Sequence, residues 1–180
     1  MLKNSSSSKN NHKSKQIRVG ILLGSASDYP VIEEGEKILS ALGISFETTV
    51  ASAHRTPDLV REFIQTSEER GVQVFIAAAG GAAALPGVVA AESLKPVIGV
   101  PITSPLSGLD SLLSIAQMPG GIPVAAVAIG KAGAKNAALL AAEIIALSDS
   151  HVADALQKQR QDQRNKVIED AKKLKSHAAS

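Results

Sequence analysis

The chain has 180 residues, of which 44% are hydrophobic and 20% are charged, and it contains no cysteine. This length and composition are typical of a single globular domain with one hydrophobic core. The lack of cysteine excludes disulfide bonds, thiolate catalysis and a cysteine-ligated metal, and no apolar run reaches the ~18 residues that a membrane span needs.

The net charge of +2 hides two parts of opposite sign. Residues 1–18 carry a charge of +5 and no acidic residue, so the rest of the chain carries −3. A slightly acidic body argues against a nucleic-acid-binding surface. Ser, Asn and Lys dominate residues 1–16, and we expect a disordered basic tail there because these residues bury little surface. The same segment lacks the apolar stretch of a secretory signal, and we expect a cytoplasmic protein.

Strand-like and helix-like segments alternate along the chain. Short apolar runs rich in Val, Ile and Leu predict strands, and longer segments bounded by Pro, Gly or a capping residue predict helices. In chain order, the predicted elements are strand 18–23, helix 29–42, strand 45–51, helix 57–70, strand 72–77, a helix ending near 93, strand 96–100, helix 109–116, strand 123–129, helix 134–147 and a polar helix over 151–174. We expect Thr56 to cap the second of these helices, with Pro57 at its first position.

Five strands that alternate with helices through short connections predict an α/β fold. Such a chain forms a parallel sheet with helices on both faces, a three-layer α/β/α sandwich, and we expect the flavodoxin-like strand order 2-1-3-4-5. In this prediction residues 17–150 form the domain and residues 151–180 an additional C-terminal helix and tail. The turns after all five strands then lie at one edge of the sheet, where open α/β sheets bind ligands.

The turn after the second predicted strand carries the sequence Ser-Ala-His-Arg-Thr-Pro, at residues 52–57. His54 is the side-chain type best suited to move a proton near neutral pH. Arg55 offers a planar fork of donors for a phosphate or a carboxylate. Taken alone, a His-Arg pair in a loop is more often a turn residue beside a solvated charge, so its interpretation depends on the other turns.

Two further turns at the same edge carry groups that can bind a nucleotide. Residues 24–28 offer hydroxyls and N–H groups at a helix start, which favours anions, although Ser and Asp are also ordinary helix caps. The Asp28 carboxylate repels phosphate and is better suited to accept hydrogen bonds from sugar hydroxyls. Gly80 and Gly81 allow a ligand to approach the backbone, or form a flexible turn. The histidines, at 12, 54, 151 and 177, lack metal-ligand spacing, so we expect no zinc site.

Five motifs occur in a fixed order. They are Gly-Ser-x-Ser-Asp at 24–28, Ser-Ala-His-Arg-Thr-Pro at 52–57, Ala-Gly-Gly-Ala-Ala-x-Leu-Pro-Gly at 79–87, Gly-Leu-Asp-Ser-Leu-Leu-Ser at 108–114 and Gln-Met-Pro at 117–119. Together they resemble the AIR carboxylase family, and in particular its class I form, the N5-carboxyaminoimidazole ribonucleotide mutases of purine biosynthesis. The resemblance spans residues 17–150.

This resemblance implies an isomerase that moves a carboxylate from the exocyclic nitrogen of an aminoimidazole ribonucleotide to ring carbon 4, without metal or cofactor. It implies that His54 is catalytic and that backbone N–H groups at 79–82 hold the transferred CO₂. The residues that we expect to bind the nucleotide substrate are Ser25, Ser27, Asp28, Ser52, Arg55, Gly80, Gly81, Ala82 and Leu85. It also implies a homo-octamer with active sites between subunits, and the Ala-rich helix 134–147 suits such close packing.

The sequence departs from the family pattern at Ala84, where many relatives carry His, and in the 102–107 loop, which is one residue shorter than in familiar bacterial members. Two other functions stay open. One is the class II reaction, the direct carboxylation of aminoimidazole ribonucleotide with CO₂, although Thr56-Pro57 and the pattern at 80–83 favour class I. The other is a non-catalytic flavodoxin-like nucleotide-binding module. A flavin carrier is disfavoured, because the chain has no Trp and one Tyr, Tyr29.

Overall fold

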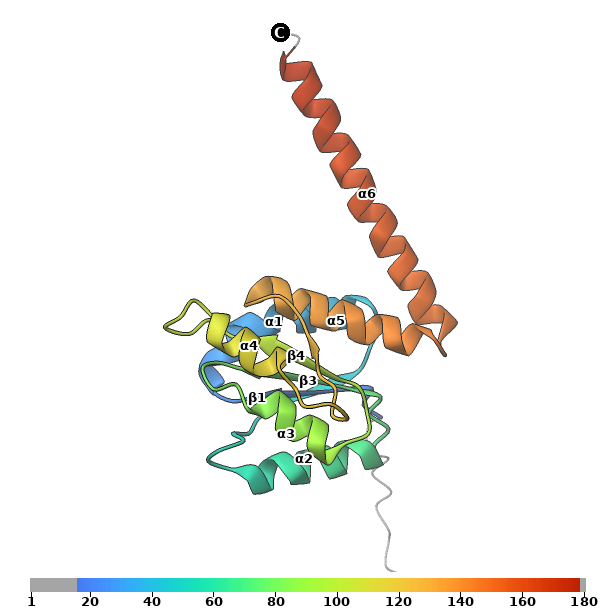
Figure 1. The fold of residues 1–180 in the computed structure, drawn as a ribbon. Coiled ribbons are helices and arrows are strands. Elements are labelled where there is room, and N and C mark those ends of the chain that lie inside the picture. Colours follow the sequence, from blue (N-terminus) through green and yellow to red (C-terminus); the bar gives the residue numbers. More distant parts are fainter. Residues whose placement is uncertain (1–15, 179–180) are drawn as a thin grey trace, which may run out of the picture.

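The computed structural model describes residues 16–178, and Figure 1 shows their arrangement. The basic tail expected over residues 1–16 lies outside this range except for Gln16. Within the described range, no helix is both long enough and apolar enough to cross a membrane.

Five parallel strands form one sheet in the order β2-β1-β3-β4-β5, which confirms the flavodoxin-like topology. The strands are β1 (Val19–Leu23), β2 (Phe46–Val50), β3 (Val74–Ala79), β4 (Val97–Pro101) and β5 (Ala125–Ala126). At the carboxyl edge, Leu23 of β1 pairs with Val50 of β2 on one side and with Ala78 of β3 on the other. The turns that follow these strands therefore meet at one edge.

Helices cover both faces of the sheet and produce the three expected layers (Figure 1). In chain order they are the 3-10 turn η1 (Ala26–Asp28), α1 (Tyr29–Ala41), α2 (Pro57–Glu69), α3 (Leu85–Glu92), α4 (Leu109–Ala116), α5 (Lys131–Ala146) and α6 (Ser150–Ala178). α1 and α5 pack on one face of the sheet, and α2 and α3 pack on the other.

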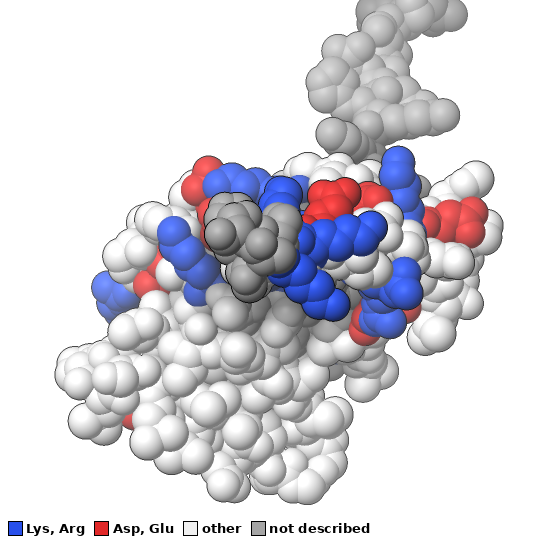
Figure 2. All heavy atoms as spheres, turned by 90° about the horizontal axis from the view of Figure 1, so that it is seen from above, with Lys and Arg blue, Asp and Glu red and all other residues white. Residues whose placement is uncertain are grey.

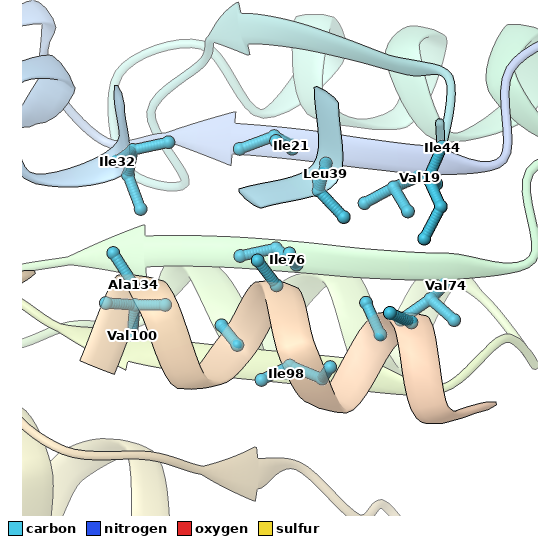
Figure 3. Packing of buried hydrophobic residues seen from close by; sticks show 14 of the residues in the cluster. Val19, Ile21, Ile32, Leu39, Ile44, Val74, Ile76, Ile98, Val100 and Ala134 are labelled. Carbon is cyan, nitrogen blue, oxygen red and sulfur yellow. The ribbon is translucent and has the colours of Figure 1, made fainter. Parts of the chain in front are cut away.

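Alternation along the buried strands builds a separate apolar cluster on each face of the sheet. Val19 and Ile21 of β1 join Ile76 of β3 in the cluster beneath α1 and α5 (Figure 3). Their sequence neighbours Leu22 and Phe75 point to the opposite face and belong to the cluster beneath α2 and α3. Small side chains let α5 lie close to the sheet and to α1. Its buried alanines are Ala134, Ala137, Ala138, Ala141 and Ala142.

Three strands lie within one residue of their predicted bounds, and β3 and β5 differ by more. β3 lies two residues further along the chain, because the Val72 N–H bonds the Ser67 carbonyl and completes the preceding turn, while the small side chains of Ala78 and Ala79 fit inside the sheet. β5 comprises Ala125–Ala126 rather than seven residues. It is an edge strand that pairs with β4 alone, so no hydrogen bonds to a second strand extend it. Short edge strands also resist pairing with other chains.

The predicted C-terminal helix is confirmed as α6, a 29-residue helix that projects from the domain (Figure 1). Its first turns pack against α5 through the buried side chains of Val152 and Leu156. Asp149 caps its start, since Oδ1 accepts hydrogen bonds from the N–H groups of His151 and Val152. Beyond Arg160 the described side chains of α6 are exposed.

Candidate active site

The turn that carries His54 is closed by Ser52 and Thr56. The Ser52 N–H donates to Thr56 Oγ1, and the Thr56 N–H donates to the Ser52 carbonyl, each at 2.9 Å. The expectation that the Thr56 side chain caps α2 is wrong, because its hydroxyl is bonded to Ser52 and not to the helix. α2 still begins at Pro57, whose fixed φ suits the first helical position. The closed turn holds His54 and Arg55 at the sheet edge.

Arg55 reaches across this edge to the turn that follows β1. Its Nη2 donates to the Gly24 carbonyl at 3.1 Å, and its Nε donates to Ser52 Oγ at 3.3 Å. Within residues 16–178 Arg55 forms no ion pair, so the guanidinium keeps its charge available for an anion. His54 is exposed beside it.

The turn after β1 gathers two hydroxyls and a carboxyl. Ser25 Oγ lies 2.8 Å from Ser27 Oγ, and the Ser27 hydroxyl donates to Asp28 Oδ1 at 3.3 Å. Asp28 is only 9% exposed. Its burial raises the pKa of the carboxyl, although hydrogen bonds with the Ser27 side chain and the Ser25 backbone lower it. A poorly solvated carboxylate of this kind gains stability from a ligand that donates hydrogen bonds to it.

The glycine-rich loop after β3 adopts an uncommon backbone conformation. Gly81 has a φ of +64° and Ala83 a φ of +40°, in the left-handed region that residues with a Cβ rarely occupy. Ser111 Oγ accepts a hydrogen bond from the Gly81 N–H at 2.9 Å, and the Ser114 hydroxyl donates to the Ala82 carbonyl. In this structure the Gly81 N–H is therefore bonded within the protein, and the expected binding of substrate by Gly81 stays a prediction.

The three turns line one cleft with a volume of about 430 Å³ at the carboxyl edge of the sheet. Most of the predicted site residues line it: Ser25, Asp28, Ser52, His54, Arg55, Gly80 and Leu85. Ser27, Gly81 and Ala82 adjoin these residues but do not line the cleft.

Ala79, from the 79–82 stretch expected to hold CO₂, also lines the cleft, whereas the remaining lining residues were not predicted as part of the site: Gly24, Ala53, Ala83 and Ala84. Small residues without a functional group carry no chemical signal in a sequence. The one signal for them is their place inside the motifs at 24–28, 52–57 and 79–87.

The start of α3 lies against the same cleft, because Ala84 and Leu85 belong to its lining. The first N–H groups of a helix have no partner inside the helix and lie at the positive end of its dipole. Together with Arg55, this helix start suits a carboxylate or a phosphate. Among residues 16–178, no cluster of three or more His, Asp or Glu side chains could hold a metal ion.

The fold and this cleft define a flavodoxin-like α/β protein with a polar cleft at its strand ends. A sequence model described as AIR carboxylase matches residues 18–166. The chain therefore belongs to the AIR carboxylase family, and the family predicted from the five motifs is confirmed.

Two relatives are named N5-carboxyaminoimidazole ribonucleotide mutases. The protein of Pyrococcus horikoshii is 52% identical, covering 90% of this chain and 91% of its own length. That of Bacillus subtilis is 51% identical, covering 88% of this chain and 99% of its own length. The crystal structure of Treponema denticola PurE matches with a TM-score of 0.79 and 35% identity, covering 87% of this chain and 98% of that one.

Proposed function

We propose that this chain is an N5-carboxyaminoimidazole ribonucleotide mutase, an isomerase of purine biosynthesis, and that His54 carries the proton in its reaction. The observation that carries this proposal is the cleft in which His54, Arg55, Asp28 and the glycine-rich loop meet. The high identity to proteins named as mutases supports the same reaction.

Substrate binding follows from the charges of the cleft. Arg55 offers a cation to the phosphate, and Ser25 and Ser52 add hydroxyls beside it. The Asp28 carboxylate accepts hydrogen bonds from the ribose hydroxyls, which relieves the cost of its burial. The substrate is thereby held at its phosphate and sugar, with the aminoimidazole ring directed toward His54 and the glycine-rich loop.

The reaction needs one proton delivered and one removed. The carbamate on the exocyclic nitrogen breaks its N–C bond and releases CO₂, while His54 protonates that nitrogen. Ring carbon 4 then forms a C–C bond to the retained CO₂, and His54 removes the hydrogen from that carbon. The two transfers balance, so His54 returns to its starting state. Histidine is the side-chain type best suited to deliver and remove protons near neutral pH, so it can carry out both steps.

Retention of CO₂ decides whether the second half of the reaction is fast. Escape would make recapture bimolecular, whereas a held CO₂ lies within bonding reach of the ring carbon. The start of α3, at Ala84 and Leu85, supplies N–H donors for CO₂ and the product carboxylate. Because Ala84 stands where many relatives carry His, His54 is the only imidazole among the residues that line this cleft.

The test is incubation of the purified chain with N5-carboxyaminoimidazole ribonucleotide while 4-carboxy-5-aminoimidazole ribonucleotide is monitored. We expect conversion in both directions without added metal or cofactor. A parallel reaction contains aminoimidazole ribonucleotide and bicarbonate. If only that reaction yields product, the chain is a direct carboxylase. If neither does, it is a nucleotide-binding module, and the mutase proposal fails.

We also propose a homo-octamer with active sites between subunits. Figure 2 shows charged side chains gathered over one part of the surface and a broad area almost without them. Between residues 96 and 130 the only charged residue is Asp110, yet this segment exposes the large apolar side chains of Leu106, Leu109 and Leu113. Exposed apolar surface of this kind marks an interaction site. A single species of monomer mass in light scattering would contradict the octamer.

The cytoplasm is the location that we propose for this activity. The substrate is a ribonucleotide that carries a phosphate and a carboxylate, and charged groups do not cross a bilayer unaided. An enzyme for such a compound works in the compartment that makes it. Fractionation of the source cells tests this assignment.

A further inference from the structure

Helix α4 presents two serines to the glycine-rich loop that borders the cleft. We propose that Ser111 and Ser114 are positioning residues, which hold the loop at residues 80–83 in the conformation that the reaction needs. This inference rests on the proposed function, because the reaction gives the loop its task. The two serines are three residues apart and lie on one side of α4.

Ser111 joins the loops that follow two neighbouring strands. Its Oγ accepts a hydrogen bond from the Gly81 N–H at 2.9 Å, and its hydroxyl donates to the Ile102 carbonyl at 2.9 Å. The side chain is fully buried, so water does not replace either bond if the hydroxyl is removed. Truncation would leave a donor after β3 and an acceptor after β4 unpaired.

Ser114 holds a second peptide of the same loop. Its hydroxyl donates to the Ala82 carbonyl, and the following residue, Ala83, has a φ of +40° and lines the cleft. A residue with a Cβ keeps such a conformation only where its surroundings enforce it. The 80–81 and 82–83 peptides are therefore both bonded to α4, and the second of them leads into the strained residue.

α4 is itself fixed to the sheet, which makes it a rigid support. Ile115 is buried, and a Cβ added to Gly99 of β4 would lie 2.4 Å from Ile115 Cγ2. The helix therefore lies directly on β4 at a glycine that leaves room for it. A site held by groups on a regular element is positioned more accurately than one on a free loop.

The consequence for the reaction is that the part of the cleft surface that would contact CO₂ is already fixed before the reaction begins. Gly80 and Ala83, the outer residues of the two bonded peptides, line the cleft. A loop that does not have to reorganise lowers the barrier for recapture of CO₂ by the ring carbon. In the proposed function the nucleotide is held elsewhere, by Arg55, Asp28 and Ser25. Its binding therefore does not depend on the hydrogen bonds that Ser111 and Ser114 form with the loop.

The experiment compares Ser111→Ala and Ser114→Ala with the unmodified chain in the conversion of N5-carboxyaminoimidazole ribonucleotide, and follows amide hydrogen exchange of the 79–85 segment. We expect each variant to lower kcat about tenfold, since small displacements of reacting groups cost up to ~10²-fold, with KM within threefold. Exchange of the segment should be faster. Ser111→Thr, which keeps the hydroxyl, should retain more activity than Ser111→Ala.

The matched control is Ser67→Ala on α2. Ser67 is also fully buried, but its hydroxyl has no hydrogen-bond partner among residues 16–178, so its removal should leave kcat and exchange unchanged. A kcat within twofold of the unmodified chain in both α4 variants overturns the proposal, as does an equal loss in Ser67→Ala. If Ser111→Ala does not fold, Ser114→Ala decides by the same limits, because Ser114 is exposed. If the unmodified chain lacks mutase activity, the proposed function fails. The hydrogen-exchange comparison alone then decides whether Ser111 and Ser114 hold the loop.

Discussion

His54 and Arg55 are neighbours in sequence, yet the structure gives their side chains different surroundings. Arg55 is tied to the Gly24 carbonyl and to Ser52. The exposed His54 side chain forms no hydrogen bond within the described part of the chain. A tied guanidinium suits the binding of a fixed anion, whereas a free imidazole can move between two proton-transfer positions. Substitution of the two residues should therefore affect different kinetic constants, kcat for His54 and KM for Arg55.

Replacement of His54 by Asn should remove turnover and preserve binding. Asn keeps a similar size and some hydrogen bonding but does not transfer a proton at neutral pH. We expect kcat to fall by at least ~10²-fold, the usual scale for a lost general acid–base group, with the nucleotide still bound in calorimetry. His151→Asn, at the exposed start of α6, is the control. A near-normal kcat in His54→Asn would show that another group carries the proton.

Replacement of Arg55 by Ala should mainly weaken substrate binding. The proposed contact of Arg55 to the phosphate is the same in the ground state and in the transition state, so its loss should raise KM and leave kcat almost unchanged. A hydrogen bond to a charged group contributes ~1.5–3 kcal/mol, which corresponds to a rise in KM of about 10- to 100-fold. Arg61→Ala on the exposed side of α2 removes the same charge away from the cleft. A large drop in kcat at saturating substrate would instead place Arg55 in the chemical step.

The packing of α1 on α5 depends on a glycine. A Cβ added to Gly35 would lie 2.7 Å from the Ala134 carbonyl oxygen, so Gly35→Ala forces the two helices apart. Alanine gains up to ~1 kcal/mol over glycine inside a helix, but overpacking costs ~1–3 kcal/mol. We expect the cost to exceed the gain and the melting temperature to fall by a few degrees.

Gly87→Ala on α3 is the matched control for this helix substitution. Its Cβ would meet the flexible end of Met118 at 3.3 Å, which can shift at little cost. The helix-propensity gain should therefore prevail, and the melting temperature should hold or rise. Equal effects of the two substitutions in thermal unfolding would count against close packing of α1 on α5.

The junction between α5 and α6 is sensitive to pH through Asp149. Its Oδ2 lies 2.7 Å from Arg18 Nη1. That bond, together with the backbone N–H groups of Val152 and His151, lowers the pKa of the carboxyl below its usual 3.8. A carboxyl with a lowered folded-state pKa stabilises the fold above its unfolded-state pKa, and this stabilisation is lost as the pH falls through the folded-state value.

Asp149→Asn should therefore lower the free energy of unfolding in urea at neutral pH. The difference from the unmodified chain should shrink below pH 3.8, the usual pKa of the carboxyl. Asp162→Asn is the control, since Asp162 is exposed and forms no ion pair within the described residues. A difference that is constant across this range would mean that Asp149 acts only as a helix cap.

At the scale of the whole molecule, α6 extends an apolar face beyond the domain. Val152 and Leu156 are buried against α5, and Val167 and Leu174 follow on the same side of the helix at spacings that sum to whole turns. Val167 is 69% and Leu174 is 73% exposed. A long helix gains most of its stability from a packed face, so a neighbouring subunit is the expected cover for this one.

A chain that ends after Asn165 should keep its domain fold and lose part of its assembly. We expect unchanged circular dichroism per domain residue and a smaller, concentration-dependent mass in light scattering. A full-length chain with Val167→Ser and Leu174→Ser separates the loss of apolar surface from the loss of length. An octamer that persists in both variants at micromolar concentration would exclude the distal part of α6 from the interface.

Much of this molecule could be predicted from the sequence because its signals are local. Apolar runs separated by Pro, Gly and helix caps predict five strands and their helices, and short connections between them leave few possible sheet orders. The motifs at 24–28 and 52–57 contain the functional groups of the cleft, and together with the glycine-rich motif they indicate the family. These features depend on residues a few positions apart, which propensity and periodicity describe well.

Only the tertiary structure decided how the groups at the edge are bonded. Thr56 closes its turn instead of capping α2, Arg55 bonds the Gly24 carbonyl, and the Gly81 N–H is taken by Ser111, thirty positions away in sequence. A hydroxyl has several possible partners of similar energy, and its choice depends on which elements pack together. The position of α4 on Gly99 of β4 brings Ser111 to Gly81, and no local pattern in the sequence specifies that contact.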